Sequence, residues 1–178
     1  MDVMTVRLAH TGDLDQATLA AARDLLFAVF DDMTEDDWEH SLGGQHAMAF
    51  EGGEVVGHAA LIQRRLLHGG RAMRAGYVEG VGVRADLRRR GIGAAMMTEL
   101  ERVARGAYDL AALGATDEAV PFYTGRGWLP WQGRTSALTP AGIVPTPDDD
   151  GGVFVLALSA SLDLEGELTC DWRDGDVW

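Results

Sequence analysis

The chain has 178 residues, a formal net charge of −13 at pH 7 and a single cysteine, Cys170, which cannot form an internal disulfide. We expect one domain over residues 1–178. The acidic excess argues against a nucleic-acid partner and suits a cationic small-molecule partner. The alternative is that the acidic residues only keep the protein soluble. No apolar run near 18 residues and no secretory signal pattern are present, so we expect no membrane partner and a cytoplasmic location.

Patterns of apolar residues and turn formers divide the chain into short strands and helices. Thr34 precedes Asp37 by three positions, a spacing typical of a capped helix start. Gly52-Gly53 predicts a hairpin turn, and Gly69-Gly70 predicts the next turn. In chain order we expect a strand at residues 3–8, a helix at 14–30, a short helix after 34, strands at 45–50 and 55–65, a strand ending in residues 77–83, a helix at 91–104, a buried parallel strand at 110–113, a short helix at 117–124, and strands at 128–131 and 153–158.

The last third of the chain gives weaker signals. Residues 139–152 are rich in proline, aspartate and glycine and are expected to form a loop. Residues 161–178 show no clear period. Because strands and helices mix without strict alternation, we expect an α+β fold in which helices flank a mixed, mostly antiparallel sheet.

The stretch from Tyr77 to Gly93, YVEGVGVRADLRRRGIG, is the most informative part of the chain. Its valines predict a strand, and the glycines near the strand end indicate a bulge or a close approach to the backbone. A turn with three arginines then leads into a helix, whose first N–H groups and dipole favour an anion. The P-loop and dinucleotide patterns do not fit, because Gly-Lys-Ser/Thr is absent and Met96 stands where a third glycine is needed. The stretch therefore predicts a phosphate-bearing cofactor, with a plain surface turn as the alternative.

Two segments carry a resemblance to a known superfamily. Arg88-x-x-Gly91-x-Gly93 after a valine-rich strand resembles the acetyl-CoA signature of the GCN5-related N-acetyltransferases. Ala119-x-x-Phe122-Tyr123-x-x-x-Gly127-Trp128 is similar to the second signature of that superfamily, in the right order and at a suitable separation. The resemblance implies the GNAT acyl-CoA N-acyltransferase fold, with acetyl-CoA as the acetyl donor.

Further segments resemble one branch, the aminoglycoside 2'-N-acetyltransferases, from about Leu8 to the last residue. The branch implies an aminoglycoside acceptor and a homodimer. Two departures stand out: Asp31-Asp32-Met33 replaces Gly-Asp-Phe, and Gly114 replaces a serine, which removes a hydroxyl near the expected acceptor site and leaves the preference among aminoglycosides open. The similar segments are Asp37-Trp38-Glu39-His40, Leu42-Gly43-Gly44, Ile62-Gln63-Arg64, Gly76-Tyr77-Val78-Glu79, Arg126-Gly127-Trp128, residues 148–151 and residues 170–178.

Acyl transfer from a thioester to an amine needs a base, a donor to the oxyanion and a proton for the leaving thiolate. The resemblance assigns Glu79 as the base, acting through water, and the Val81 N–H as the oxyanion donor. Tyr123 would protonate the thiolate, since a phenol with a pKa of about 10 is protonated at neutral pH. From the residues alone, an ion pair for Glu79 and core packing for Tyr123 stay open.

The remaining site residues follow from the same resemblance. Scattered carboxylates suit a polyamine sugar, although each acid alone could be an ordinary solvated surface residue. The histidines show no ligand spacing, so no metal is expected. The expected coenzyme residues are Val81, Val83, Arg88, Arg89, Arg90, Gly91, Ile92, Gly93 and Ala94. The expected acceptor residues are Asp32, Asp37, Glu79, Gly80, Gly114, Asp149, Asp176 and Trp178, the last through its α-carboxylate.

These inferences predict an enzyme that moves acetyl from acetyl-CoA to the 2'-amine of an aminoglycoside by direct attack in a ternary complex. One rival is the same fold acting on another polyamine or a cell-wall amino sugar, which would not need the sequence of residues 170–178. The other rival is a binding protein without turnover, against which the presence of both Glu79 and Tyr123 argues.

Overall fold

A computed structural model of the protein describes residues 4–178. The chain divides into two compact units. The first contains Met1–Ile62 and Val78–Val103, and the second contains Gln63–Tyr77 and Ala104–Trp178. The single domain over residues 1–178 stays a prediction, and the predicted strand start at Val3 lies outside the described residues.

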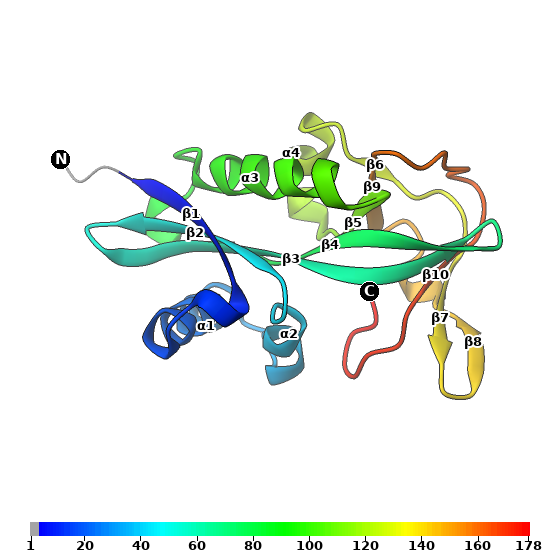
Figure 1. Cartoon of the computed structure of the whole chain (residues 1–178), viewed down its shortest axis with the longest axis horizontal. Helices are drawn as coiled ribbons and strands as arrows, with labels where there is room; N and C mark the ends of the chain where they lie inside the picture. The colour runs from blue at the N-terminus through cyan, green and yellow to red at the C-terminus, as the bar shows by residue number, and fades with distance from the viewer. Residues whose placement is uncertain (1–3) are drawn as a thin grey trace. The chain divides into compact units, whose positions relative to one another are not determined.

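The first unit is a sheet covered by helices on both faces. β1 pairs antiparallel with β2, and β2 pairs antiparallel with β3. Figure 1 shows α1 and α2 on one face of this sheet and α3 on the other. The elements are β1 Thr5–His10, α1 Gln16–Val29, α2 Glu35–His40, β2 Gln45–Glu51, β3 Glu54–His68 up to residue 62, β4 Arg71–Val83 from residue 78, and α3 Ile92–Ala107 up to residue 103.

Glycines in the sheet allow these helices to pack closely. A Cβ atom at Gly57 of β3 would lie 3.1 Å from both Ile92 Cγ2 and Met96 Sδ of α3. A Cβ atom at Gly82 of β4 would lie 3.0 Å from Leu26 Cδ2 of α1. Such contacts are tighter than ordinary packing allows, so both positions favour glycine because the helices approach the strand backbone.

The short helix α2 forms as the local sequence predicts. Thr34 Oγ1 accepts a hydrogen bond from the Asp37 N–H at 3.2 Å, and Asp37 Oδ2 accepts one from the Thr34 N–H at 2.8 Å. This reciprocal capping box satisfies two N–H groups that a helix start leaves without partners. It also places the buried ring of Trp38 in the core of the first unit, beside Leu26 and Met48.

The second unit contains the other parts of β3 and β4 and the remaining strands. Its strand order is β6-β9-β5-β4-β3-β10-β7-β8. Pairing is parallel for β4 with β5 and for β10 with β7, and antiparallel for β5 with β9 and β7 with β8. The sheet is therefore mixed and mostly antiparallel, as predicted. The new elements are β5 Leu110–Gly114, α4 Val120–Gly125, β6 Leu129–Pro130, β7 Thr135–Thr139, β8 Gly142–Pro145, β9 Val153–Ala157 and β10 Leu168–Cys170.

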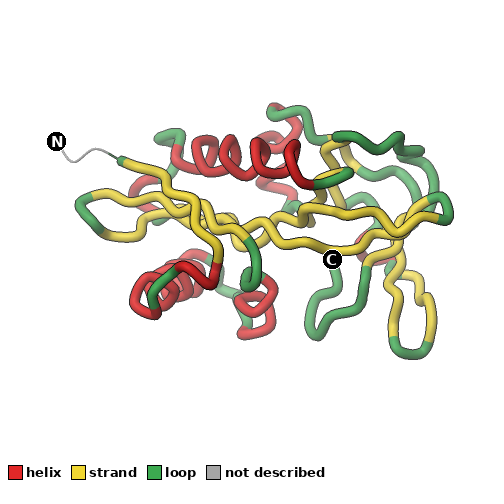
Figure 2. The backbone as a smooth tube through the Cα atoms, in the orientation of Figure 1, coloured by secondary structure: helices red, strands yellow, loops and turns green. Residues whose placement is uncertain are grey.

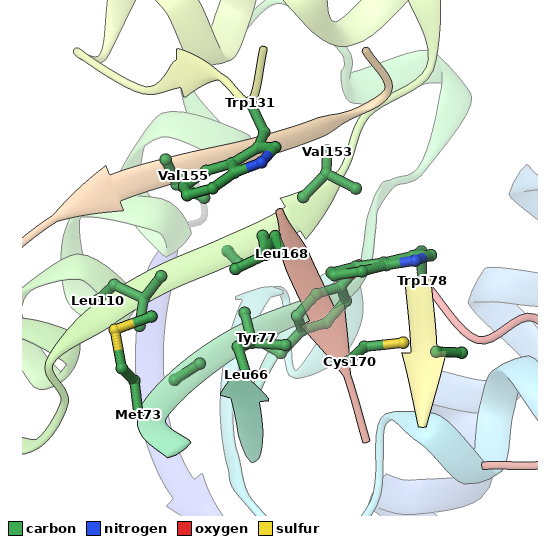
Figure 3. Close-up of a cluster of buried hydrophobic side chains, with 13 residues drawn as sticks. Leu66, Met73, Tyr77, Leu110, Trp131, Val153, Val155, Leu168, Cys170 and Trp178 are labelled. Atoms are coloured by element: carbon green, nitrogen blue, oxygen red, sulfur yellow. The ribbon is translucent and has the colours of Figure 1, made fainter. Parts of the chain in front are cut away.

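Aromatic side chains dominate the core of the second unit. Figure 3 shows Tyr77, Trp131 and Trp178 in one cluster with aliphatic residues of β3, β5 and β9. Trp178 is 6% exposed although it lies at the end of a segment without regular structure, which Figure 2 draws as loop. Chain ends usually fray unless a contact holds them, so the tail is an integral part of this unit.

One sequence prediction was wrong, and others were shortened or missed. Residues 139–152 do not form a single loop, because Thr139 and Gly142 close the β7–β8 hairpin and a 3-10 turn, Pro147–Asp149, follows. Gly142 has φ of 112°, a conformation that turn residues need and that glycine adopts freely. The strand expected at residues 128–131 is reduced to Leu129–Pro130, and neither β7 nor β10 was predicted.

Two histidines lie in the core of the first unit and are hydrogen-bonded to each other. His46 and His58 are both fully buried, with 2.9 Å between His46 Nδ1 and His58 Nε2. Burial lowers the pKa of each to about 4, and charge repulsion from His58 also contributes at His46. Both rings are therefore neutral at pH 7.

This pair should make the protein sensitive to mild acid. The folded-state pKa values lie below the ordinary value of 6.5, so the unfolded chain takes up protons first. The free energy of unfolding therefore has its full value above pH 6.5. It decreases as the pH falls towards 4, by about 1.4 kcal/mol per pH unit for each histidine. Urea unfolding at several pH values measures this. A free energy of unfolding that stays constant between pH 6.5 and pH 5 would contradict the prediction.

Candidate active site

The end of β4 in the first unit carries the residues expected to perform the chemistry. Glu79 and Val81 are partly buried, and Gly80 between them has φ of 55°. A Cβ atom at Gly80 would lie 2.8 Å from Ser41 Oγ and 3.0 Å from Leu26 Cδ1. Both the backbone conformation and the lack of space favour glycine here, in agreement with the predicted strand irregularity.

The arginine-rich turn after β4 in the first unit has the backbone geometry expected of an anion site, and it is called the anion cradle below. Arg89 has φ of 59° and Gly91 has φ of 81°, so two left-handed residues lie just before α3. The Ala95 N–H donates to Gly91 O at 3.0 Å, which makes it the first bonded N–H of the helix; the earlier N–H groups have no intrahelical acceptor. The space beside Gly91 is open. This geometry fits a pyrophosphate, which needs several N–H donors and positive potential.

The arginines of this turn have different surroundings. Arg90 pairs with Glu51 at 3.3 Å, and Arg88 Nε donates weakly to Val83 O at 3.4 Å. Arg89 is exposed. The expected coenzyme residues from Val83 to Ala94 are therefore brought together at one strand end and one helix start.

Two acidic residues expected at the acceptor site lie in or near α2. Asp32 is exposed in the turn before the helix. Asp37 is half-buried, and its Oδ2 already accepts hydrogen bonds from Thr34. A role for Asp37 in forming the helix is therefore visible, and a role in binding an acceptor stays a prediction.

In the second unit, Gly114, Tyr77 and Trp178 lie close together. Gly114 is exposed at the end of β5, and a Cβ atom there would lie 3.7 Å from the Tyr77 hydroxyl oxygen and 3.8 Å from the main-chain carbon of Trp178. These are ordinary van der Waals distances. A serine would fit at this position, and the glycine leaves a small space beside the tail.

Arginine side chains hold the tail in the second unit. Arg64, which is 4% exposed, donates to Asp171 Oδ1 at 2.7 Å and to Val177 O at 2.8 Å. Arg173 donates to the main-chain oxygen of Asp176 at 2.7 Å and to that of Trp178 at 3.1 Å. Both guanidinium groups lie over the Tyr77 ring, at 4.7 and 5.4 Å from its centroid. The tail is thus fixed by charge-assisted hydrogen bonds and cation–π contacts.

The acidic residues of the second unit interact with one another. Burial raises the pKa of Asp149, and repulsion from Asp176, Asp148 and Asp150 raises it further. Asp176 is exposed and accepts the Trp178 N–H at 3.2 Å. Asp149 and Asp176 were predicted separately from the sequence, and the structure places them near enough for their charges to repel each other. Such a cluster attracts a cation.

Tyr123 is buried in α4, with 6% of its surface exposed. Burial raises the pKa of its phenol to about 12, and Arg126 opposes this shift. Its ring makes edge contacts with Phe122 and Trp128, at centroid distances of 5.1 and 6.0 Å. The phenol is therefore protonated at neutral pH, as a proton donor must be. The ring contacts are equally consistent with the alternative that Tyr123 serves core packing.

Comparisons with known proteins bear on this arrangement. Residues 6–130 match the model of a family described as "Acetyltransferase (GNAT) domain". The chain is 52% identical over 179 residues to an aminoglycoside 2'-N-acetyltransferase of Mycolicibacterium fortuitum, covering 98% of this chain and 92% of the relative. The chain belongs to the GNAT acetyltransferase family. It is therefore an acetyltransferase with an α+β fold, and membership implies acetyl-CoA as the donor.

Solved structures agree on the fold of this GNAT protein. An acyl-CoA N-acyltransferase from Pseudomonas aeruginosa aligns with a TM-score of 0.63 and 18% identity over 87% of this chain and 100% of that one. Eis1 from Mycobacterium abscessus aligns with a TM-score of 0.61 and 23% identity, covering 75% of this chain and 32% of that longer chain. At these identities the similarity concerns the fold alone.

Several residues that shape the site were not assigned a role from the sequence. Arg64, Tyr77 and Arg173 lie inside segments that resemble the aminoglycoside branch, and that similarity was their only signal. The sequence did not indicate a role for His46 or His58, because a single histidine in a strand does not by itself predict a function. Among residues 4–178, no helix is long and apolar enough to cross a bilayer, and no group of three or more His, Cys, Asp or Glu side chains is placed to hold a metal ion.

The strained backbone at Arg89 gives a test of the conformation of this turn. A non-glycine residue in the left-handed region costs about 1–2 kcal/mol. Arg89→Gly and Arg89→Ala both remove the charge, but only the glycine removes the strain, so the glycine variant should be about 1 kcal/mol more stable than the alanine variant. Urea unfolding of the two variants measures this difference. Equal stabilities, or a more stable alanine variant, would show that the turn does not hold residue 89 in this conformation.

Proposed function

We propose that this GNAT protein transfers acetyl from acetyl-CoA to the 2'-amino group of an aminoglycoside. The main support is the 52% identity over 98% of the chain to a protein named for that activity. The net charge of −13 and the acidic cluster of the second unit favour a polycationic acceptor. A homodimeric state and a cytoplasmic location are further parts of the proposal, to be tested by light scattering and by cell fractionation.

Acetyl-CoA supplies the activated acetyl thioester in this proposal. The backbone N–H groups from Arg89 to Ala94 bind the pyrophosphate, and the side chains of Arg88, Arg89 and Arg90 supply positive charge around it. The backbone of Val83 holds the pantetheine arm. The open space beside Gly91 supports this assignment, since phosphate oxygens must approach the backbone closely.

The chemistry is assigned to three groups. Glu79 removes a proton from the acceptor ammonium through a water molecule, and the amine then attacks the thioester carbonyl directly. The Val81 N–H donates to the oxygen on which negative charge develops. Tyr123 donates its hydroxyl hydrogen to the sulfur as the C–S bond breaks, and the second proton lost by the attacking nitrogen restores the phenol. The phenol is protonated throughout the neutral range, as this role requires.

The acceptor is assigned to acidic and small residues, as the resemblance to the aminoglycoside branch implies. Ammonium groups of the sugar pair with carboxylates, and the glycines leave space beside them. The proposed residues are Asp32, Asp37, Glu79, Gly80, Gly114, Asp149, Asp176 and Trp178. Another polyamine or a cell-wall amino sugar is the second candidate, and the missing hydroxyl at Gly114 is the observation in its favour.

The position of the reacting amine gives the first test of this proposal. Two aminoglycosides that differ only in a 2'-amino or a 2'-hydroxyl group should differ in rate by at least tenfold, because the hydroxyl analogue offers no amine at that position. Release of free CoA thiol gives the rate, and NMR of the product gives the acetylated position. Equal rates, or acetylation at another amine, would contradict the regiochemistry. A higher rate with a simple polyamine would favour the second candidate.

The role of Tyr123 gives the second test. Tyr123→Phe removes only the hydroxyl, so kcat should fall by about 10²- to 10⁴-fold while acetyl-CoA affinity changes little. Tyr108→Phe is the matched control, since Tyr108 is a partly buried tyrosine of the same unit without an assigned role. Steady-state kinetics on both variants decide. If the Tyr123 variant keeps kcat within a factor of three of the wild type, Tyr123 serves packing alone.

A further inference from the structure

A continuous chain of side-chain hydrogen bonds crosses the core of the first unit and ends on the catalytic strand. Thr11 Oγ1 lies 2.7 Å from His46 Nε2, His46 Nδ1 lies 2.9 Å from His58 Nε2, and His58 Nδ1 lies 2.7 Å from the carbonyl oxygen of Gly80. The register of β2 and β3 pairs His58 with Met48, two residues from His46. The two imidazoles are therefore diagonal neighbours on one face of the sheet.

The groups at the two ends determine which nitrogen of each histidine ring carries the hydrogen. A carbonyl oxygen can only accept, so His58 Nδ1 carries hydrogen and donates to Gly80. The neutral ring then accepts at Nε2 from His46 Nδ1, and His46 accepts at Nε2 from the Thr11 hydroxyl. Thr11 Oγ1 in turn accepts from the Gly43 N–H at 2.9 Å. Burial keeps both rings neutral, so one arrangement of hydrogens satisfies all four groups.

The chain cannot deliver a proton to the reaction, because its last group is a peptide carbonyl. What it can do is orient the peptide bond between Gly80 and Val81. The described chain contains no cis peptide bond, and in a trans peptide the C=O and the N–H point in opposite directions. A Gly80 carbonyl held by His58 therefore directs the Val81 N–H away from the histidines.

Orientation needs such support at this position. Gly80 has φ of 55°, and glycine has more accessible backbone conformations than any other residue. The peptide that follows it can rotate unless a hydrogen bond holds the carbonyl. His58 provides this bond from a fully buried position, and Ser41 and Leu26 enclose the glycine. Thr11 anchors the far end, because its own N–H donates to Gly44 O at 3.0 Å.

We propose that His58 is a positioning residue for acetyl transfer, and that His46 and Thr11 support it. By holding the Gly80 carbonyl, His58 keeps the Val81 N–H directed at the acetyl oxygen, so that the oxyanion donor is in place before the reaction begins. This inference rests on the proposed function only through the assignment of Val81 as that donor. Preorganised donors act in this way because no reorientation is needed when charge develops.

The kinetic experiment replaces His58 in two ways. His58→Leu removes the donor to Gly80, and kcat should fall about 10²- to 10³-fold, the loss expected when an oxyanion donor is no longer in place. His58→Asn keeps an N–H near the position of Nδ1, so its kcat should recover to within about tenfold of the wild type. The dissociation constant of acetyl-CoA, measured by calorimetry, should change less than about threefold in both, because the phosphate cradle is unaffected.

A matched control is available in the same chain. His68 Nδ1 lies 2.9 Å from the carbonyl oxygen of Glu167, a bond of the same type in the second unit. His68→Leu should leave kcat within about threefold of the wild type. A His58→Leu variant with kcat in that same range would overturn the proposal. So would equal losses of kcat in the Leu and Asn variants accompanied by loss of acetyl-CoA binding, since both would then reflect damage to the fold.

A measurement on the wild type does not depend on the variants folding. Nitrogen NMR of the imidazoles should show Nδ1 protonated and Nε2 unprotonated for both His46 and His58 at pH 7. An Nε2–H tautomer at His58 would overturn the inference, because that ring could not donate to Gly80. The proposed function fails separately, if wild-type protein with the expected tautomers releases no CoA thiol with any amine tested.

Discussion

The arrangement of the first unit depends on the left-handed backbone conformation of Gly80. A side chain at this position would be strained by φ of 55° and would also lie 2.8 Å from Ser41 Oγ. The helix α1 can therefore pack against the strand only because no Cβ is present, and His58 can reach the carbonyl for the same reason. Helix packing, the histidine chain and the direction of the Val81 N–H all depend on one residue without a side chain.

In the second unit, the arrangement of the C-terminal tail depends on a buried charge, that of Arg64. Arg64 is 4% exposed, and a guanidinium so deeply buried must have partners, since removing one partner of a buried ion pair costs about 3–5 kcal/mol. Asp171 and the carbonyl of Val177 provide them, and both belong to the tail. The irregular residues after β10 are therefore fixed by the requirements of a charge on β3. This explains how a segment without periodicity can be as ordered as a strand.

The sequence predicted features that depend on neighbouring residues and missed those that depend on distant partners. The capping box of α2 involves Thr34 and Asp37, three positions apart, and was visible as a spacing. β10 has only three residues, and its pairing with β3 and β7 defines it as a strand. The histidine chain requires the register of β2 and β3 as well as the position of Gly80. Turn composition predicted a loop at residues 139–152, which was wrong, because it could not reveal the four-residue strand β8 that the pairing with β7 defines.

The two glycines expected at the acceptor site differ in a way that bears on specificity. At Gly80 both the left-handed backbone and the close contacts with Ser41 and Leu26 disfavour any side chain. At Gly114 a Cβ atom would make only ordinary contacts, at 3.7 Å or more, so the fold does not demand glycine there. A glycine that folding does not require leaves the end of β5 without a side-chain group that could donate to or accept from a ligand. A substitution of Gly114 is therefore expected to change the choice of acceptor, whereas a substitution of Gly80 is expected to disturb the backbone of the strand that carries Glu79 and Val81.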